Sequence, residues 1–315
     1  MRIVFKADAS SKIGSGHVMR TSAIAQEVIA RSIPAVFIGR VSEMPWISEH
    51  VQKIGFQEIV WEPSQFVPDS SQDILVLDSY ELPMGEKFIQ PDNWRAVVNI
   101  FDELTPSYGC KLRIHPGITK FWGDLPGIKT LSGAEYVPLR KSIKRNSEYL
   151  QRNYPEIIVV GGGSDSTNFT LEIANILQSM DAQFHVNLFS DRGNTLTLDD
   201  RFSLFPIGGD FDDIANISEL AFTTASTTSL EFLARGAAIG IGCSVDNQEL
   251  YYKELSGGRF VAPIGEFLDG VWRLNKETIY RLVNSEDFRK NLRSKANGLI
   301  DLDGSKRIVD EILKL

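Results

Sequence analysis

The feature that most constrains this chain is a pattern that occurs twice: an apolar, β-branched run ends in a glycine turn, and a helical pattern follows. The first copy runs from "RIVFKAD" through "GSGH" into the apolar positions that recur from Val18 onward. The second runs from "EIIVVGGGSDSTN" into "LEIANILQSM". A strand that passes through a glycine turn into a helix is typical of a parallel sheet covered by helices. The chain is therefore expected to have an α/β fold.

Further apolar runs extend both halves of the pattern. In the order of the chain they are "AVFIG", "DILVLDSY", "WRAVVNIFDE", "CKLRIHP", "FHVNLFS", "LAFTTAS" and "AAIGIGC". The polar, basic stretch 140–155, closed by a proline, separates the halves and reads as a linker. With 315 residues, the chain exceeds one ordinary core. We predict two Rossmann-like domains, 1–145 and 155–315, whose parallel sheets face a cleft. The last helical turn is a candidate to pack back on the first domain.

Composition removes several classes of function. The net charge of −8 disfavours a nucleic-acid partner and, more weakly, an anionic lipid surface. The chain contains no uncharged apolar stretch of about 18 residues, so no membrane span is expected, and the opening "IVF" is too short for a secretory signal. Cys110 and Cys243 lack a metal-like spacing and indicate a cytoplasmic protein with reduced thiols. The four histidines are scattered and no His/Cys/carboxylate cluster suggests zinc, so no metal is predicted. No cofactor is expected, and the oligomeric state stays open.

The first glycine turn, Gly14–His17, is the first candidate site. A helix N-terminus presents unpaired N–H groups and a positive dipole end, and Gly14 and Gly16 would let a ligand approach the backbone. His17 is either an ordinary helix residue bonded to the backbone or a neutral general base, since a positive helix end disfavours imidazolium. Asp8 could orient the ring or bind a substrate hydroxyl, although its charge would favour imidazolium. Arg20 could carry phosphate charge or lie on the surface.

The second half offers candidates for a nucleotide. Gly162 and Gly163 lie in a turn that either binds phosphate through backbone amides or is an ordinary tight turn. Small hydroxyl residues end the next strand and open a helix, where they could donate to a diphosphate or simply cap the helix. Glu231 could accept hydrogen bonds from a ribose. The side-chain amides near residue 247 could form hydrogen bonds with hydroxyl or amide groups of a ligand, or they could belong to an ordinary loop. The hydroxyl residues are Ser226, Thr227 and Thr228, and the amides are those of Asn247 and Gln248.

Taken in order, several pieces of the chain resemble one known family. These are "KADASSKIGSGHVMR", "VLDSYEL", "FDE", "YVPLR", "VVGGGSD", "STTSLEFLARG" and "DNQ", within roughly 1–252. They are similar to the PseG family, UDP-2,4-diacetamido-2,4,6-trideoxy-β-L-altropyranose hydrolases of pseudaminic acid biosynthesis, with SpsG-like polysaccharide proteins as relatives. The resemblance implies a GT-B-like fold of the MurG type, with UDP held by the C-terminal domain.

The resemblance also implies a reaction and roles for residues. His17 would activate a water that attacks the anomeric carbon of a UDP-linked diacetamido sugar, with inversion and without a metal. The free sugar would serve nonulosonic acid biosynthesis. Asn247 would contact the sugar, Glu231 the ribose, and Tyr80 matches the tyrosine of the family's "D-x-Y" strand end. UDP leaves as a stable anion, so the reaction needs no general acid, unlike that of an ordinary glycosidase with its two carboxylates.

Three departures from the family pattern keep other functions open. The chain has Lys6 where the family usually has arginine, Ser79 where histidine is common, and "FTTASTTSLE" where many relatives have a glycine pair. A soluble GT-B glycosyltransferase with a UDP-sugar donor, acting in surface polysaccharide biosynthesis, is the principal alternative. A catalytically silent sugar-nucleotide binding protein is the second.

Overall fold

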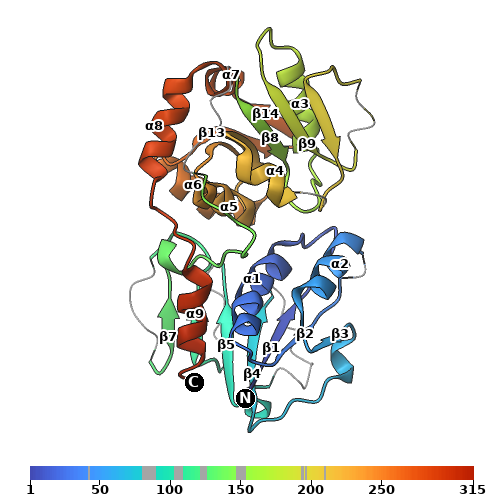
Figure 1. Cartoon of the computed structure of the whole chain (residues 1–315), viewed down its shortest axis with the longest axis vertical. Coiled ribbons are helices and arrows are strands. Elements are labelled where there is room, and N and C mark those ends of the chain that lie inside the picture. The colour runs from blue at the N-terminus through green and yellow to red at the C-terminus, as the bar shows by residue number, and fades with distance from the viewer. Residues whose placement is uncertain are drawn as a thin grey trace. The chain divides into compact units, whose positions relative to one another are not determined.

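The chain folds into two compact units, each with its own parallel sheet (Figure 1). The computed structural model describes residues 1–41, 43–79, 90–102, 109–120, 126–146, 154–192, 195, 197–208 and 211–315. The first unit comprises Met1–Lys141 together with Asp301–Leu315, and the second comprises Ser142–Ile300. The predicted α/β class, with sheets that are predominantly parallel, is confirmed.

In its described residues the first unit has a seven-stranded parallel sheet of order β3-β2-β1-β4-β5-β6-β7. The strands are β1 (Arg2–Ala7), β2 (Ala35–Ile38), β3 (Glu58–Val60), β4 (Asp73–Asp78), β5 (Ala96–Ile100), β6 (Leu112–Ile114) and β7 (Lys129–Leu131). The helices are α1 (Gly16–Ala30), α2 (Pro45–Ile54) and α9 (Gly304–Ile312), with short 3₁₀ turns at Pro63–Gln65, Pro91–Asn93 and Ala134–Tyr136. The central strands are buried, which explains why the sequence shows them as nearly continuous apolar runs.

The C-terminal helix α9 belongs to the first unit. Its residues Ile308, Val309 and Ile312 are fully buried in the same hydrophobic core as Val18 and Ile24 of α1. The C-terminal segment thus packs on the first domain, the possibility that the sequence left open. Residues 301–315 join the N-terminal domain because the apolar face of α9 is buried in that unit's core.

The second unit has a sheet of order β10-β9-β8-β11-β12-β13-β14, parallel except for the antiparallel pair β13–β14. The strands are β8 (Glu156–Val160), β9 (His185–Phe189), β10 (Phe202–Phe205), β11 (Leu220–Thr224), β12 (Ala238–Cys243), β13 (Ala262–Leu268) and β14 (Val271–Leu274). The helices are α3 (Phe169–Gln178), α4 (Phe211–Ile217), α5 (Thr227–Arg235), α6 (Glu249–Gly257), α7 (Lys276–Asn284) and α8 (Glu286–Ala296), and a 3₁₀ turn covers Asp246–Gln248.

The described part of the expected linker is attached to the second unit. The hydroxyl of Ser142 donates to Asp212 at 2.6 Å, and the backbone N–H of Asn146 donates to the carbonyl of Arg235 at 2.9 Å. Ile143 is 3% exposed. The prediction of a solvated linker is therefore wrong for residues 142–146, because these hydrogen bonds and the buried Ile143 hold the segment against its own unit.

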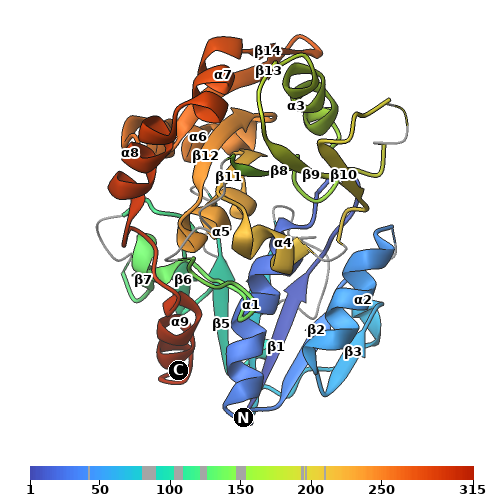
Figure 2. The ribbon, with the colours of Figure 1, turned by 45° about the horizontal axis from the view of Figure 1, so that its top comes forward.

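Both sheets reverse their strand order at one point, where ligands bind in open parallel sheets. In the first unit the chain moves outward from β1 through β2 to β3 and then returns to β4 on the other side of β1. In the second unit the corresponding neighbours are β8 and β11. Figure 2 shows α1 following β1 and α5 following β11. The predicted residues near 17 and near 226 therefore begin helices at the two switch points.

We expect Ile308→Ala to destabilise the first unit by about 2–5 kcal/mol, because the change leaves a cavity in its core. Urea denaturation would measure this loss. Lys306→Ala, an exposed change on the same helix, is the matched control and is expected to stay within about 0.5 kcal/mol of wild type. Equal stability of the two variants would contradict the placement of α9.

Candidate functional site

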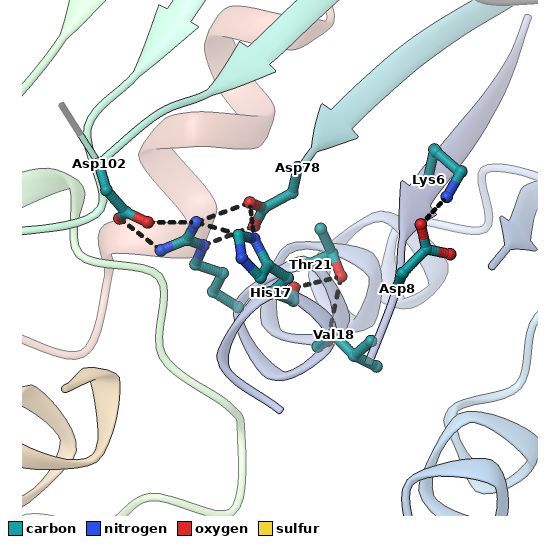
Figure 3. A network of polar contacts seen from close by, with 8 residues as sticks. Lys6, Asp8, His17, Val18, Thr21, Asp78 and Asp102 are labelled. Atoms are coloured by element: carbon teal, nitrogen blue, oxygen red, sulfur yellow. Dashed lines mark hydrogen bonds and ion pairs between the residues drawn. The ribbon is translucent and has the colours of Figure 1, made fainter. Parts of the chain in front are cut away.

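A cluster of charged and polar side chains lies at the carboxyl edge of the first unit's sheet (Figure 3). Asp78 ends β4, and Asp102 follows β5 by two residues. His17 lies in the first turn of α1, and Arg20 lies about one turn further along the helix. All four are buried, with exposed fractions between 1% and 7%. We call His17, Arg20, Asp78 and Asp102 the buried charge cluster.

Asp78 fixes the ring of His17. Its Oδ1 lies 2.5 Å from His17 Nδ1, and its two oxygens accept from Nη2 and Nε of Arg20 at 2.6 and 2.5 Å. Burial alone would raise the pKa of Asp78, but the charges and hydrogen bonds of Arg20 and His17 outweigh it and hold that pKa below its ordinary value. The carboxylate is therefore ionised and only accepts hydrogen bonds. Nδ1 of His17 must then carry a hydrogen, which leaves Nε2 as the basic nitrogen of the neutral ring.

Arg20 joins two carboxylates. It donates through Nη1 and Nη2 to Asp102 at 2.6 and 2.9 Å, in addition to its two contacts with Asp78. Burial would lower the pKa of Arg20, but Asp102 and Asp78 raise it well above the ordinary value, so the guanidinium stays charged. The expectation that Arg20 lies on the surface is wrong, because the residue is 4% exposed. Its guanidinium binds two carboxylates, and a contact with phosphate stays a prediction.

His115, directly after β6, borders the cluster. Its Nε2 lies 3.2 Å from the carbonyl oxygen of Asp102, and its Nδ1 accepts from the N–H of Gly117 at 3.3 Å. This pattern requires the hydrogen on Nε2. Burial lowers the pKa of His115 to about 4, against the opposing charge of Asp102. The imidazole is therefore neutral near pH 7 and adds no charge to the cluster.

Asp8 does not orient the ring of His17. Its carboxylate contacts the ammonium of the buried Lys6 and accepts the backbone N–H of Arg40 at 2.7 Å. The prediction that Asp8 might orient the imidazole is wrong, since Asp78 from the neighbouring strand occupies that place. A contact of Asp8 with a substrate hydroxyl stays a prediction.

The glycine turn before α1 adopts the conformation that its residues suggest. Gly14 has φ = +83°, a left-handed value that favours glycine, and its N–H donates to the carbonyl of Ser10 at 2.8 Å. A Cβ atom at Gly14 would meet nothing within 4 Å, so the backbone angle rather than crowding requires glycine there. Gly16 is the first residue of α1, and the side chain of the N-cap Ser15 makes no capping hydrogen bond.

The candidates of the second unit gather at the carboxyl ends of β8, β11 and β12. Gly162 has φ = +93°, beside Gly163. Ser226 is the N-cap of α5, yet its hydroxyl makes no capping hydrogen bond; it contacts the carbonyl of Thr224 at 3.4 Å. Thr227 and Thr228 form the first turn of α5.

Three further candidates differ in their setting. Glu231 is 5% exposed and faces Arg235 at 3.6 Å, so its carboxylate sits beside a buried cation. Gln248 accepts through Oε1 from the backbone N–H and the hydroxyl of Ser244, which makes it part of its own loop. Asn247 is exposed. Tyr80 lies outside the described residues.

Sequence reasoning missed the partners of His17. Asp78 and Asp102 each stand where an apolar strand pattern ends, and both fall in the motifs "VLDSYEL" and "FDE". A carboxylate at the end of a central parallel strand was the available signal. Within the described ranges, no group of three or more His, Cys, Asp or Glu side chains could hold a metal ion. No helix of the described chain has the length and apolar character needed to cross a bilayer.

Comparison with known proteins supports the resemblance. No protein-family profile matches the chain. The chain is 21% identical over 185 residues to the UDP-2,4-diacetamido-2,4,6-trideoxy-β-L-altropyranose hydrolase of Campylobacter jejuni, covering 56% of this chain and 66% of the relative. It is 21% identical over 270 residues to an uncharacterized protein of Methanocaldococcus jannaschii, covering 76% and 55%. The chain thus spans 66% and 55% of the lengths of these relatives. The hydrolase match confirms the similarity that the motifs indicated.

Solved structures establish the class of fold. MurG of Acinetobacter baumannii has a TM-score of 0.67 at 11% identity, with 100% of both chains covered. The spinosyn rhamnosyltransferase SpnG in complex with thymidine diphosphate gives the same values. A UDP-N-acetylglucosamine 2-epimerase has a TM-score of 0.60 at 12% identity, covering 99% of this chain and 95% of the epimerase. The fold is GT-B-like, as expected, and the chain is similar in sequence to a nucleotide-sugar hydrolase.

We expect the pH dependence of stability to report on His115. The unfolded imidazole takes up a proton near pH 6.5, whereas the buried one does so only near pH 4. Stability is therefore lost as the pH falls below 6.5, by about 2 kcal/mol between pH 7 and pH 5. Urea denaturation of wild type and His115→Gln at both pH values would measure it. The variant should lose less stability over this interval, and an identical loss in both proteins would contradict the assignment.

Proposed function

We propose that this protein is an enzyme that processes nucleotide sugars, and that it hydrolyses a UDP-linked 2,4-diacetamido-2,4,6-trideoxy sugar with His17 as general base. The observation that carries the proposal is the contact between Asp78 and Nδ1 of His17. It leaves the basic nitrogen of the ring on the opposite side, at Nε2. The similarity to the Campylobacter jejuni hydrolase supports the class of substrate.

In the proposed reaction His17 acts on water. Nε2 takes a proton from the water while the water oxygen bonds to the anomeric carbon, on the face opposite to the nucleotide. The bond between that carbon and the phosphate oxygen breaks, and its electron pair leaves with UDP. The product is the free sugar of inverted configuration, and the imidazolium returns its proton to solvent. Asp78 stabilises the imidazolium, and general-base catalysis of this kind contributes about 10²–10⁴-fold.

We further propose that the second unit binds the nucleotide. The N-terminus of α5 carries the positive end of a helix dipole, and the hydroxyl groups of Ser226, Thr227 and Thr228 lie beside it. Gly162 and Gly163 would let the diphosphate approach the backbone of the β8–α3 turn. The exposed Asn247 is the candidate for the sugar. Glu231, whose Oε2 lies 3.6 Å from Nη1 of Arg235, is the candidate for the ribose.

A glycosyltransferase is the second candidate function, favoured by the folds of MurG and SpnG. The donor would bind in the same way, but His17 would deprotonate an acceptor hydroxyl instead of water. Product analysis separates the two functions. A hydrolase releases UDP and a reducing sugar with no acceptor present, whereas a transferase needs an acceptor for turnover. We expect UDP release without an acceptor when the protein is incubated with a panel of UDP-2,4-diacetamido sugars and followed by NMR.

We expect His17→Ala to lower kcat by about 10²–10⁴-fold while binding of UDP is retained, because the base is lost and the nucleotide site is not. Asp78→Asn should act in the same direction, since an amide can present its N–H groups to Nδ1 and favour the wrong tautomer. His50→Gln, a change on α2 of the same unit, is the control and should leave kcat near the wild-type value. Unchanged turnover of His17→Ala would end the proposal.

Two N-cap serines test the nucleotide site. Ser285 caps α8 by accepting the N–H of Phe288 at 3.2 Å, whereas Ser226 caps nothing. We expect Ser226→Ala to weaken UDP binding roughly 10- to 100-fold through loss of a charged hydrogen bond. Its stability should change little. Ser285→Ala should cost about 1 kcal/mol of stability with UDP affinity unchanged. Calorimetry and urea denaturation measure both, and equal UDP affinities would argue against a phosphate contact.

A further inference from the structure

We propose that Asp102, acting through Arg20, is a positioning residue that balances the charge beside His17 and thereby sets the pH range in which this base works. The inference rests on the proposed function of His17. Asp102 accepts two hydrogen bonds from Arg20, and Arg20 in turn contacts both Asp78 and His17. Its influence on His17 is therefore indirect.

The first part of this inference is geometric. Arg20 uses Nε and Nη2 on Asp78, and Nη1 and Nη2 on Asp102. Two forks on one planar guanidinium fix its plane as well as its position. Asp102 thus holds the guanidinium, the guanidinium holds Asp78, and Asp78 holds Nδ1 of His17. Loss of Asp102 frees one side of Arg20, so the carboxylate that orients the ring is held less tightly.

The second part concerns charge. Nη2 of Arg20 lies 3.1 Å from Nδ1 of His17, so the guanidinium opposes a second positive charge on the ring. With a neutral ring, one cation and two carboxylates give the cluster a charge of −1. Proton uptake by His17 brings this to zero. Without the charge of Asp102, the same uptake would leave a buried charge of +1, which is costly where water is excluded. Asp102 is the carboxylate in excess, and this excess favours the imidazolium that catalysis requires.

Other charged groups near the cluster leave this balance unchanged. Lys6 and Asp8, from β1 and the turn after it, pair with each other and contribute no net charge. His115, after β6, stays neutral above about pH 4 because burial lowers its pKa. Asp78, from β4, is ionised throughout the working range because Arg20 and His17 overcome the effect of burial on its pKa. The charge balance at His17 therefore depends on Arg20, Asp78 and Asp102.

Two substitutions test the inference because they predict opposite shifts. Asp102→Asn keeps the shape and removes the negative charge. We expect the acid limb of its pH–rate profile to move down by about one pH unit, a tenfold change in proton affinity, and kcat to fall about tenfold with KM unchanged. Arg20→Gln removes the positive charge, and its acid limb should move up. A general loss of structure would not produce shifts of opposite sign.

Asp73→Asn is the matched control. Asp73 lies at the other end of β4, is fully buried, and accepts two hydrogen bonds from Arg2 at 2.9 and 2.7 Å. Its replacement breaks a comparable Arg–Asp fork in the same strand and should leave the pH profile where it is. If Arg20→Gln fails to fold, comparison of the pH profiles of Asp102→Asn and Asp73→Asn tests the inference. A shift confined to Asp102→Asn supports the inference, and no shift, or the same shift in both variants, overturns it.

NMR titration of the imidazoles separates this inference from the proposed function. The chain has four histidines, so the ring signals of His17 can be assigned with a His17→Ala sample. We expect the ring of His17 to protonate at lower pH in Asp102→Asn than in wild type, and at higher pH in Arg20→Gln. This readout needs no substrate. If no UDP-sugar is turned over, the hydrolase is refuted, and the titration still tests the role of Asp102. If the enzyme is active but the titration curve of His17 is the same in wild type and in the variants, the role of Asp102 is refuted.

Discussion

The guanidinium of Arg20, buried between the carboxylates of Asp78 and Asp102, is the interaction on which the candidate site depends. It joins the start of α1 to the ends of β4 and β5, segments that lie 58 and 82 positions away along the chain. Burying three charges is expensive, and such groups add little net stability compared with apolar side chains of similar volume. What they provide is a defined geometry. Removing Arg20 would leave two carboxylates in the core without a cation between them.

This geometry gives His17 a direction as well as a place. An ionised Asp78 accepts the hydrogen on Nδ1 and thereby determines which nitrogen of the neutral ring is basic. Arg20 alone would oppose a charged ring, and Asp102 offsets that effect. His115 stays neutral because burial lowers its pKa, and Lys6 is paired with Asp8. The cluster therefore holds the imidazole of His17, the proposed base, among fixed charges.

The fold by itself leaves the reaction open. Sugar transferases and an epimerase share this GT-B-like architecture at 11–12% identity. The reaction therefore depends on the side chains at the switch points and not on the fold. In the first unit these are the imidazole proposed as the base and its charged partners. In the second they form the start of a helix whose N-cap hydroxyl is not used for capping. The similarity to a nucleotide-sugar hydrolase is consistent with the base proposed for the first unit and the diphosphate site proposed for the second.

The sequence by itself determined the local elements: the central strands, the two glycine turns and the helices that follow them, because apolar spacing and glycine conformation act over a few residues. It also indicated His17 as a candidate, at the start of the helix after the first glycine turn. It did not reveal the edge strands β3, β7, β10 and β14, which are short and largely exposed on one face and so lack a strong apolar pattern. Only the tertiary structure decided that α9 belongs to the first unit and that Asp78, rather than Asp8, contacts His17. These choices depend on which strands become neighbours in the sheet, and strand order is set by packing between residues far apart in the chain, which no local pattern records.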